Sequence, residues 1–177
     1  MPKVLASKNP HTVNVSSDGH RWGGIRFEDW NFDEGNTYSQ WVAYGQSKTA
    51  NILFTYAWAQ NLGPKGLKTY TLHLGEIMRT SLANYFCEED LASLVRIQWP
   101  MTEASAERMT SISKRWSSVL SHMLSLPFDT GLKDYNGPYL DDGNLAQDEV
   151  QPVARNPEDV EKLWKPSEKL VGQEFAY

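Results

Sequence analysis

Residues 39–73 read SQWVAYGQSKTANILFTYAWAQNLGPKGLKTYTLH, and this stretch carries the strongest fold signal in the chain. From about Ser39 to Asn61 the apolar residues recur at the i, i+3, i+4 spacing of a core-facing helix, namely Ala50, Leu53, Phe54, Ala57 and Trp58. Gly63-Pro64-Lys65-Gly66 is typical of a helix end, because glycine accepts a left-handed cap and proline cannot continue the helix. The run from Leu67 to His73 then predicts a strand.

A first strand precedes this helix. Residues 12–17 are rich in β-formers and stop at Asp18-Gly19, as a strand that enters a turn does. The order strand, helix, strand predicts a right-handed βαβ crossover, with two parallel strands and the helix on one face. Between strand and helix, residues 19–37 lack helical periodicity, and we expect an ordered loop held by the aromatic side chains Trp22, Phe27, Trp30 and Phe32.

The rest of the chain divides into two further zones. The pattern from Leu74 to about Leu126 is helical, with one apolar stripe formed by Met109, Ile112, Trp116, Val119 and Met123. Residues 137–140 predict a strand, residues 141–143 a turn, and Asn156-Pro157-Glu158 the start of a helix that Pro166 interrupts. We therefore expect one domain built from a βαβ segment (1–86), a helical region (87–136), and a last strand with a C-terminal helix (137–177).

Composition narrows the class of protein. The 177 residues suffice for one domain, and 40% hydrophobic with 12% aromatic residues can form a core. Lys and Arg number 17 against 22 Asp and Glu, a net charge of −5 without basic blocks, which argues against nucleic acid or an anionic membrane as main partner. The single cysteine, Cys87, excludes an internal disulfide and favours a reducing compartment. Because neither a signal peptide nor an apolar run of about 18 residues is visible, we expect a soluble cytoplasmic protein.

Three side chains form a candidate reactive set. Tyr44 and Lys48 are at positions i and i+4 of the predicted helix, so their side chains share one face. A neighbouring cation favours the phenolate by Coulomb attraction, which makes Tyr44 a candidate acid or base. Ser17 ends the preceding strand, where parallel sheets gather ligand-binding groups, and its hydroxyl can polarise a carbonyl oxygen. The Tyr-Lys spacing alone also fits a solvated surface pair.

Other candidate sites are weaker. The four histidines, at 11, 20, 73 and 122, have no ligand-like spacing, so we expect no metal site. The acidic runs Asp141-Asp142 and Glu88-Glu89-Asp90 are typical of a solvated turn and a helix start. Cys87 has no evident base, which argues against a cysteine nucleophile.

Several motifs together resemble the short-chain dehydrogenase/reductase family, and within it the retinol-dehydrogenase-like branch. They are Val13-Asn14-Val15-Ser16-Ser17, then Ala43-Tyr44-Gly45-Gln46-Ser47-Lys48-Thr49-Ala50-Asn51, then Leu72-His73-Leu74-Gly75 with Thr80. The resemblance spans about residues 3–86 and returns over 156–175. It implies a Rossmann-type enzyme that passes a hydride between NAD or NADP and a small alcohol or carbonyl substrate.

The resemblance also implies roles for individual residues. Tyr44 would be the acid and base, Ser17 would hold the substrate oxygen, and Lys48 would favour the phenolate and bind the nicotinamide ribose. The backbone at Gly75 and Ile77 and the hydroxyl of Thr80 would line the cofactor. The family often forms dimers or tetramers through the tyrosine helix, so residues 44–58 could mediate homo-oligomers.

The chain departs from the family pattern at its N-terminal side. The Gly-rich phosphate loop and the residue that selects the adenosine ribose have no counterpart, and Gly19, Gly23 and Gly24 are interpreted as turn glycines because they open no predicted helix. The strand before Ser17 corresponds to the family's fifth. The prediction is thus an α/β, incomplete Rossmann-type doubly wound fold without its first strands and without the N-terminal cofactor-binding half.

Two functions follow from this sequence. One is short-chain dehydrogenase/reductase chemistry impaired by truncation. The other is a non-catalytic fragment or pseudoenzyme that acts through protein-protein association.

Overall fold

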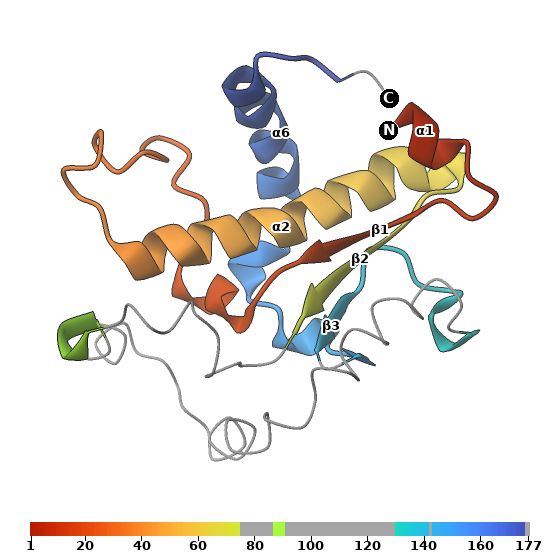
Figure 1. Cartoon of the computed structure of the whole chain (residues 1–177), viewed down its shortest axis with the longest axis horizontal. Helices are drawn as coiled ribbons and strands as arrows, with labels where there is room; N and C mark the ends of the chain where they lie inside the picture. Colours follow the sequence, from red (N-terminus) through yellow and green to blue (C-terminus); the bar gives the residue numbers. More distant parts are fainter. Residues whose placement is uncertain (75–86, 91–129, 142, 176–177) are drawn as a thin grey trace.

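The computed structural model describes residues 1–74, 87–90, 130–141 and 143–175 (Figure 1). Its centre is a four-stranded sheet in the order β1-β2-β3-β4. The strands are β1 (His11–Val15), β2 (Lys68–His73), β3 (Tyr139–Asp141) and β4 (Asn144–Leu145). The first three strands are parallel, and β4 returns antiparallel to β3. The α/β prediction is confirmed, and both strands predicted around the long helix pair with each other in parallel.

The long helix, α2 (Gln40–Leu62), forms the crossover between β1 and β2 and lies across the sheet (Figure 1). The two strands are in register from His11 opposite Lys68 to Val15 opposite Leu72. After α2 the chain makes a short 3-10 turn and reaches Gly66 at φ +91°, a backbone angle that glycine adopts without steric cost. The predicted helix and its glycine-proline end are therefore confirmed.

Helix α2 is buried on more than one side. Leu53 and Ala57 pack with Val160 and Leu163 of the C-terminal helix α6 (Pro157–Val171), and Ala50 and Phe54 border this cluster. The predicted apolar stripe thus faces mainly α6. The side towards the sheet is partly polar, because Asn14 Nδ2 of β1 donates to Thr55 Oγ1 at 2.8 Å.

Helix α6 begins as predicted, with the Asn156 side chain accepting the Glu158 N–H at 3.1 Å. The expectation that Pro166 interrupts it is wrong, because α6 continues to Val171. A proline inside a helix removes one hydrogen bond, but packing around it can hold the helix together. Here the carboxylate of Glu168, the residue two positions on, accepts hydrogen bonds from Trp164 Nε1 at 3.0 Å and from the Phe175 N–H at 2.7 Å.

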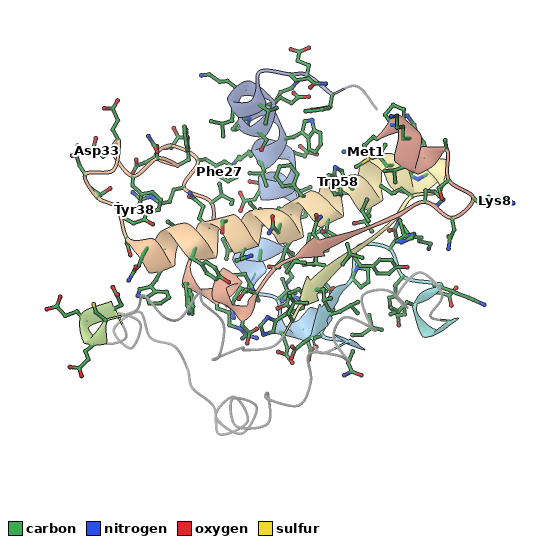
Figure 2. The ribbon with its side chains drawn as sticks, in the orientation of Figure 1. Met1, Lys8, Phe27, Asp33, Tyr38 and Trp58 are labelled. Atoms are coloured by element: carbon green, nitrogen blue, oxygen red, sulfur yellow. The ribbon has the colours of Figure 1, made fainter. Side chains whose placement is uncertain are left out.

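The loop after β1 opens with a 3-10 helix, η1 (Asp18–Trp22), which the sequence did not predict. The Trp22 ring meets Trp41 at 5.3 Å, Phe32 is buried, and Phe27 packs beside the α2–α6 cluster. Figure 2 shows Phe27 beside these helices, Asp33 on the outer part of the loop, and Tyr38 where the loop returns to the start of α2. The fourth predicted anchor is wrong, since Trp30 is 47% exposed. The loop is held there instead by Gln46 Nε2, which donates to the Trp30 carbonyl at 3.0 Å.

Much of the predicted helical region, including its apolar stripe, lies outside the described residues. Its described parts are residues 87–90 and 130–136, and the second begins with a 3-10 helix, η6 (Thr130–Leu132). Residues 87–90 are joined to the start of α2 by a hydrogen bond from Trp41 Nε1 to the Asp90 carbonyl at 3.1 Å. None of the helices in the described ranges combines the length and the apolar character needed to cross a bilayer.

Candidate active site

The structure brings Ser17, Tyr44 and Lys48 to one edge of the sheet, where β1 ends beneath the first half of α2. Ser17 lies two residues after the end of β1 and caps η1, while Tyr44 and Lys48 lie on successive turns of α2. Ser16 joins the two elements, because its Oγ donates to the Lys48 carbonyl at 2.8 Å and its N–H to Leu72 at 2.9 Å. The turn that holds Ser17 is therefore fixed to the helix that carries the other two residues.

Ser17 is half-buried, and its hydroxyl accepts the Gly19 N–H at 3.0 Å. A serine hydroxyl has one hydrogen and two lone pairs. The bond from Gly19 uses a lone pair and leaves the hydrogen for another acceptor. Within the described residues this hydrogen has no acceptor. The Ser17 hydroxyl can therefore still donate one hydrogen bond.

The ring of Tyr44 lies directly against the backbone of Gly19. A Cβ atom at position 19 would stand 2.4 Å from Tyr44 Cε1 and 2.7 Å from Cδ1, so only glycine allows this approach. The Trp22 ring also lies beside the tyrosine, with centroids 5.6 Å apart at an angle of 42°. Gly19, which was interpreted as a turn glycine, lies instead within the 3-10 helix η1, where it brings Ser17 and Tyr44 onto adjoining surfaces.

The ammonium of Lys48 lies 5.3 Å from the centroid of the Tyr44 ring, which confirms that the i, i+4 pair shares a face. Its one hydrogen-bond partner in the described ranges is the Val15 carbonyl at 3.5 Å, an oxygen that also accepts the stronger 2.9 Å bond from Asn51 Nδ2. Burial lowers the pKa of Lys48, because desolvation disfavours the charged form. An ammonium has three donors, so Lys48 can bind further acceptors without losing this contact.

Two small residues of α2 let the helix seat on the Ser17 turn, and sequence reasoning did not single them out. A Cβ at Gly45 would lie 2.8 Å from the Gly23 nitrogen and 2.9 Å from the Gly19 oxygen. One turn further, the buried Thr49 hydroxyl lies 2.7 Å from the Gly23 carbonyl and 3.2 Å from that of His20. The i, i+4 spacing of Gly45 and Thr49, with no large side chain at either, is a signal that could have revealed this contact.

The other predicted candidates fall into two groups. Gly75, Ile77 and Thr80 lie outside the described residues. In the acidic run, Asp90 accepts the Cys87 N–H at 2.9 Å, which lowers the pKa of this carboxyl group, while Glu88 and Glu89 are exposed. Nowhere in the described ranges do three His, Cys, Asp or Glu side chains come together in a way that could hold a metal ion.

Comparison with known proteins places this arrangement in a family. No family model matches the sequence. The chain is 31% identical over 172 residues to retinol dehydrogenase 12 of Homo sapiens, with 97% of this chain and 49% of that protein covered. It is 30% identical over 178 residues to the short-chain dehydrogenase/reductase prx1 of Penicillium roqueforti, with 95% and 50% covered.

A solved structure agrees with the sequence comparison. The crystal structure of an uncharacterized protein from Mycobacterium Paratuberculosis superposes with a TM-score of 0.54 at 25% identity, covering 94% of this chain and 52% of that chain. The chain spans about half the length of the curated relatives it matches.

Over nearly its whole length the chain is therefore similar to about half of a short-chain dehydrogenase/reductase. Within that family its similarity extends to retinol dehydrogenases, as the motifs around Ser17 and Tyr44 indicated. The similarity covers nearly the whole chain and so reaches beyond the two stretches that the motifs marked.

Proposed function

We propose that this chain carries the reactive side of a short-chain dehydrogenase/reductase, which transfers a hydride between NAD or NADP and a small alcohol or carbonyl compound. The observation that carries the proposal is the seating of the Ser17 turn on α2 through Gly19 and Gly45. This contact gathers a hydroxyl donor, a phenol and an ammonium at the carboxyl end of a parallel strand, where open α/β sheets bind ligands.

Each side chain has a role that its surroundings support. The free hydrogen of Ser17 donates to the substrate oxygen and holds it beside the tyrosine. During reduction the Tyr44 hydroxyl gives its proton to that oxygen, and during oxidation the phenolate takes the proton back. The ammonium of Lys48, 5.3 Å from the ring centroid, stabilises the phenolate by Coulomb attraction.

The residues around Lys48 fit the nicotinamide end of a dinucleotide. When bound, the nicotinamide supplies or accepts the hydride. Lys48 would hold its ribose, because the single long bond to Val15 leaves ammonium donors for the sugar hydroxyls. Gly75, Ile77 and Thr80 complete the proposed cofactor contacts.

Nicotinamide fluorescence tests this proposal directly. NADPH and NADH are titrated into the wild-type chain and into the variants Lys48→Met and Tyr44→Phe. Lys68→Met is the matched control. Lys68 is the first residue of β2 and lies away from the candidate site, and its ammonium donates to the Lys133 carbonyl at 2.9 Å.

We expect saturable binding that Lys48→Met weakens about tenfold or more, corresponding to about 1.4 kcal/mol. Lys68→Met should bind as the wild type does, and Tyr44→Phe should bind but lose turnover with aldehyde or alcohol substrates. Folded wild-type protein that binds neither cofactor, or equal affinity in Lys48→Met, would contradict the proposal.

A second candidate function is protein association, and it is favoured by the position of β1. Within the described residues β1 pairs only with β2, so its other edge presents unpaired backbone groups. Unpaired parallel edges bind further strands. The buried Thr12 hydroxyl of this strand also has no hydrogen-bond partner among the described residues. A chain that forms stable oligomers in light scattering and binds no cofactor would favour this function over catalysis.

A further inference from the structure

His20 is fully buried beside Ser17, and the proposed chemistry makes no use of it. Its exposed fraction is 0%. The ring Nδ1 lies 2.8 Å from the Ser17 carbonyl, and the His20 N–H donates to that same oxygen at 3.1 Å. On its other side, ring Nε2 is 3.3 Å from the Gln151 nitrogen. His20 thus holds the backbone of Ser17 and links it to Gln151, which lies 131 positions after His20 in the chain.

The partners of the two ring nitrogens determine where the proton sits. A carbonyl oxygen only accepts, so Nδ1 must carry the hydrogen that it donates to Ser17. A backbone N–H only donates, so Nε2 must offer its lone pair to Gln151. The neutral ring protonated on Nδ1 satisfies both contacts, and no other form of the ring does.

The ring is also held in place by its packing. It meets the ring of Tyr139 in β3 edge to face, with centroids 5.4 Å apart. The carbonyl of His20 lies 3.2 Å from the Thr49 hydroxyl of α2. Contacts with β3, with α2 and with Gln151 therefore fix the histidine, and through it the Ser17 turn.

We propose that His20, as the neutral tautomer protonated on Nδ1, is a positioning residue that fixes Ser17 by tying its carbonyl to the segment at Gln151. The role in catalysis rests on the proposed function of Ser17. The hydrogen bonds from His20 to Ser17 and Gln151 do not rest on that function, because they are a property of the fold. The ring holds the backbone carbonyl of the residue that carries the hydroxyl.

Charged groups around the ring act in both directions. The hydrogen bond to the Ser17 backbone favours the charged imidazolium, Arg21 of η1 disfavours it, and the charge of Asp18 and a hydrogen bond to the Glu149 backbone favour it. Desolvation is the largest effect and lowers the pKa of His20. Arg21 also makes a second link between the same segments, since its guanidinium lies 3.4 Å from Asp18 and 3.3 Å from the Glu149 carboxylate.

The test uses NMR and amide hydrogen exchange on the whole chain. Nitrogen shifts of the wild-type ring report its tautomer at neutral pH. His20→Phe keeps an aromatic ring but removes both nitrogens, and His20→Asn restores a donor close to the Nδ1 position. Arg21→Met is the matched control, because it cuts the second link between the segments without touching the Ser17 carbonyl.

We expect the neutral Nδ1–H tautomer in the wild type. In His20→Phe the Gly19 amide, which binds Ser17 Oγ, should exchange about tenfold faster or more, whereas amides in the centre of β2 should not change. His20→Asn should restore protection at Gly19 but not at Gln151, and Arg21→Met should leave Gly19 protected. A purely structural role would instead change all these amides together.

Two results would overturn the inference. One is an imidazolium or an Nε2–H tautomer in the folded wild type at neutral pH, which needs no variant to fold. The other is unchanged exchange at Gly19 in a folded His20→Phe protein. If the wild type binds no cofactor but shows the expected exchange pattern, the proposed function fails and the tie between His20 and Ser17 stands.

Discussion

Substituting Gly45 by alanine sets two effects of known size against each other. Alanine is a better helix former than glycine by about 1 kcal/mol, so helix propensity alone predicts a more stable protein. The new Cβ, however, would lie 2.8 Å from the Gly23 nitrogen, 2.9 Å from the Gly19 oxygen and 3.0 Å from the Trp22 carbonyl carbon. All three are backbone atoms, which cannot rotate away as a flexible side chain could.

The steric clash of the new Cβ should therefore cost more free energy than the higher helix propensity of alanine contributes. Overpacking a buried site costs about 1–3 kcal/mol, and a clash with backbone belongs at the upper end of that range. Subtracting the helix gain leaves a net loss of about 2 kcal/mol, or a fall in melting temperature of about 4–8 °C for a chain of this size. Because α2 must move away from the Ser17 turn, cofactor binding should weaken as well.

Urea unfolding followed by tryptophan fluorescence measures this loss. Gly23→Ala is the control on the facing side of the same contact, because its Cβ would meet Val42 at 3.4 Å, an ordinary van der Waals distance. Its φ of 176° suits any residue, so we expect a change within about 0.5 kcal/mol. A Gly45→Ala protein as stable as the wild type, or more stable, would refute the tight seating of the helix on the turn.

Three further predictions concern other parts of the fold. Burial lowers the pKa of His20, so as the pH falls the histidine is protonated in the unfolded chain before it is protonated in the folded one. The free energy of unfolding should therefore fall by up to about 1.4 kcal/mol per pH unit below pH ~6.5. Urea unfolding from pH ~7 to ~5.5 should show a flatter dependence of stability on pH for His20→Phe. Asn136→Ala should cost about 1–2 kcal/mol by the same assay, because the Asn136 amide accepts the Thr69 N–H and donates to the Leu67 carbonyl. Pro166→Ala should raise the melting temperature, because it restores a backbone N–H donor inside α6, and we expect a gain in stability of about 1–2 kcal/mol. An unchanged or lower melting temperature would show that the proline fits its helix without cost.

Local patterns in the sequence predicted the central unit of the fold. The apolar spacing of α2 and its glycine-proline end are short-range signals, and a strand on each side leaves a parallel crossover as the usual solution. The same pattern did not reveal which neighbour each face meets. The stripe around Leu53 and Ala57 packs on α6, whereas a more polar face with Thr55 meets β1. Only the tertiary arrangement of sheet and helices decides this.

Longer-range contacts explain where the sequence-based expectations failed. Pro166 was expected to interrupt the last helix, but Glu168 and the residues it binds hold the helix on both sides of it. Trp30 was expected to anchor the loop, but the backbone carbonyl of Trp30 makes the contact and leaves its ring exposed. In both cases partners several residues away override the local preference.

The candidate site was predictable to a similar extent. Tyr44 and Lys48 follow from helical spacing, and Ser17 follows from its place at a strand end. His20 could not be found in this way, because its partner Gln151 lies 131 positions away and a lone histidine in a loop has no pattern of its own. Gly45 and Thr49 were missed although their i, i+4 spacing without a large side chain was visible, because the backbone of residues 19–23 that they contact comes from a loop whose path the sequence did not predict.

The central claim is that the Ser17 turn and the first half of α2 form one nicotinamide site. Amide chemical shifts of the isotope-labelled chain, recorded while NADPH is added, test it most directly. We expect saturable shifts concentrated at Gly19 and from Gly45 to Lys48, with little change at Lys68 at the start of β2. Shifts that are absent in folded protein, or that gather away from the carboxyl end of β1, would contradict it.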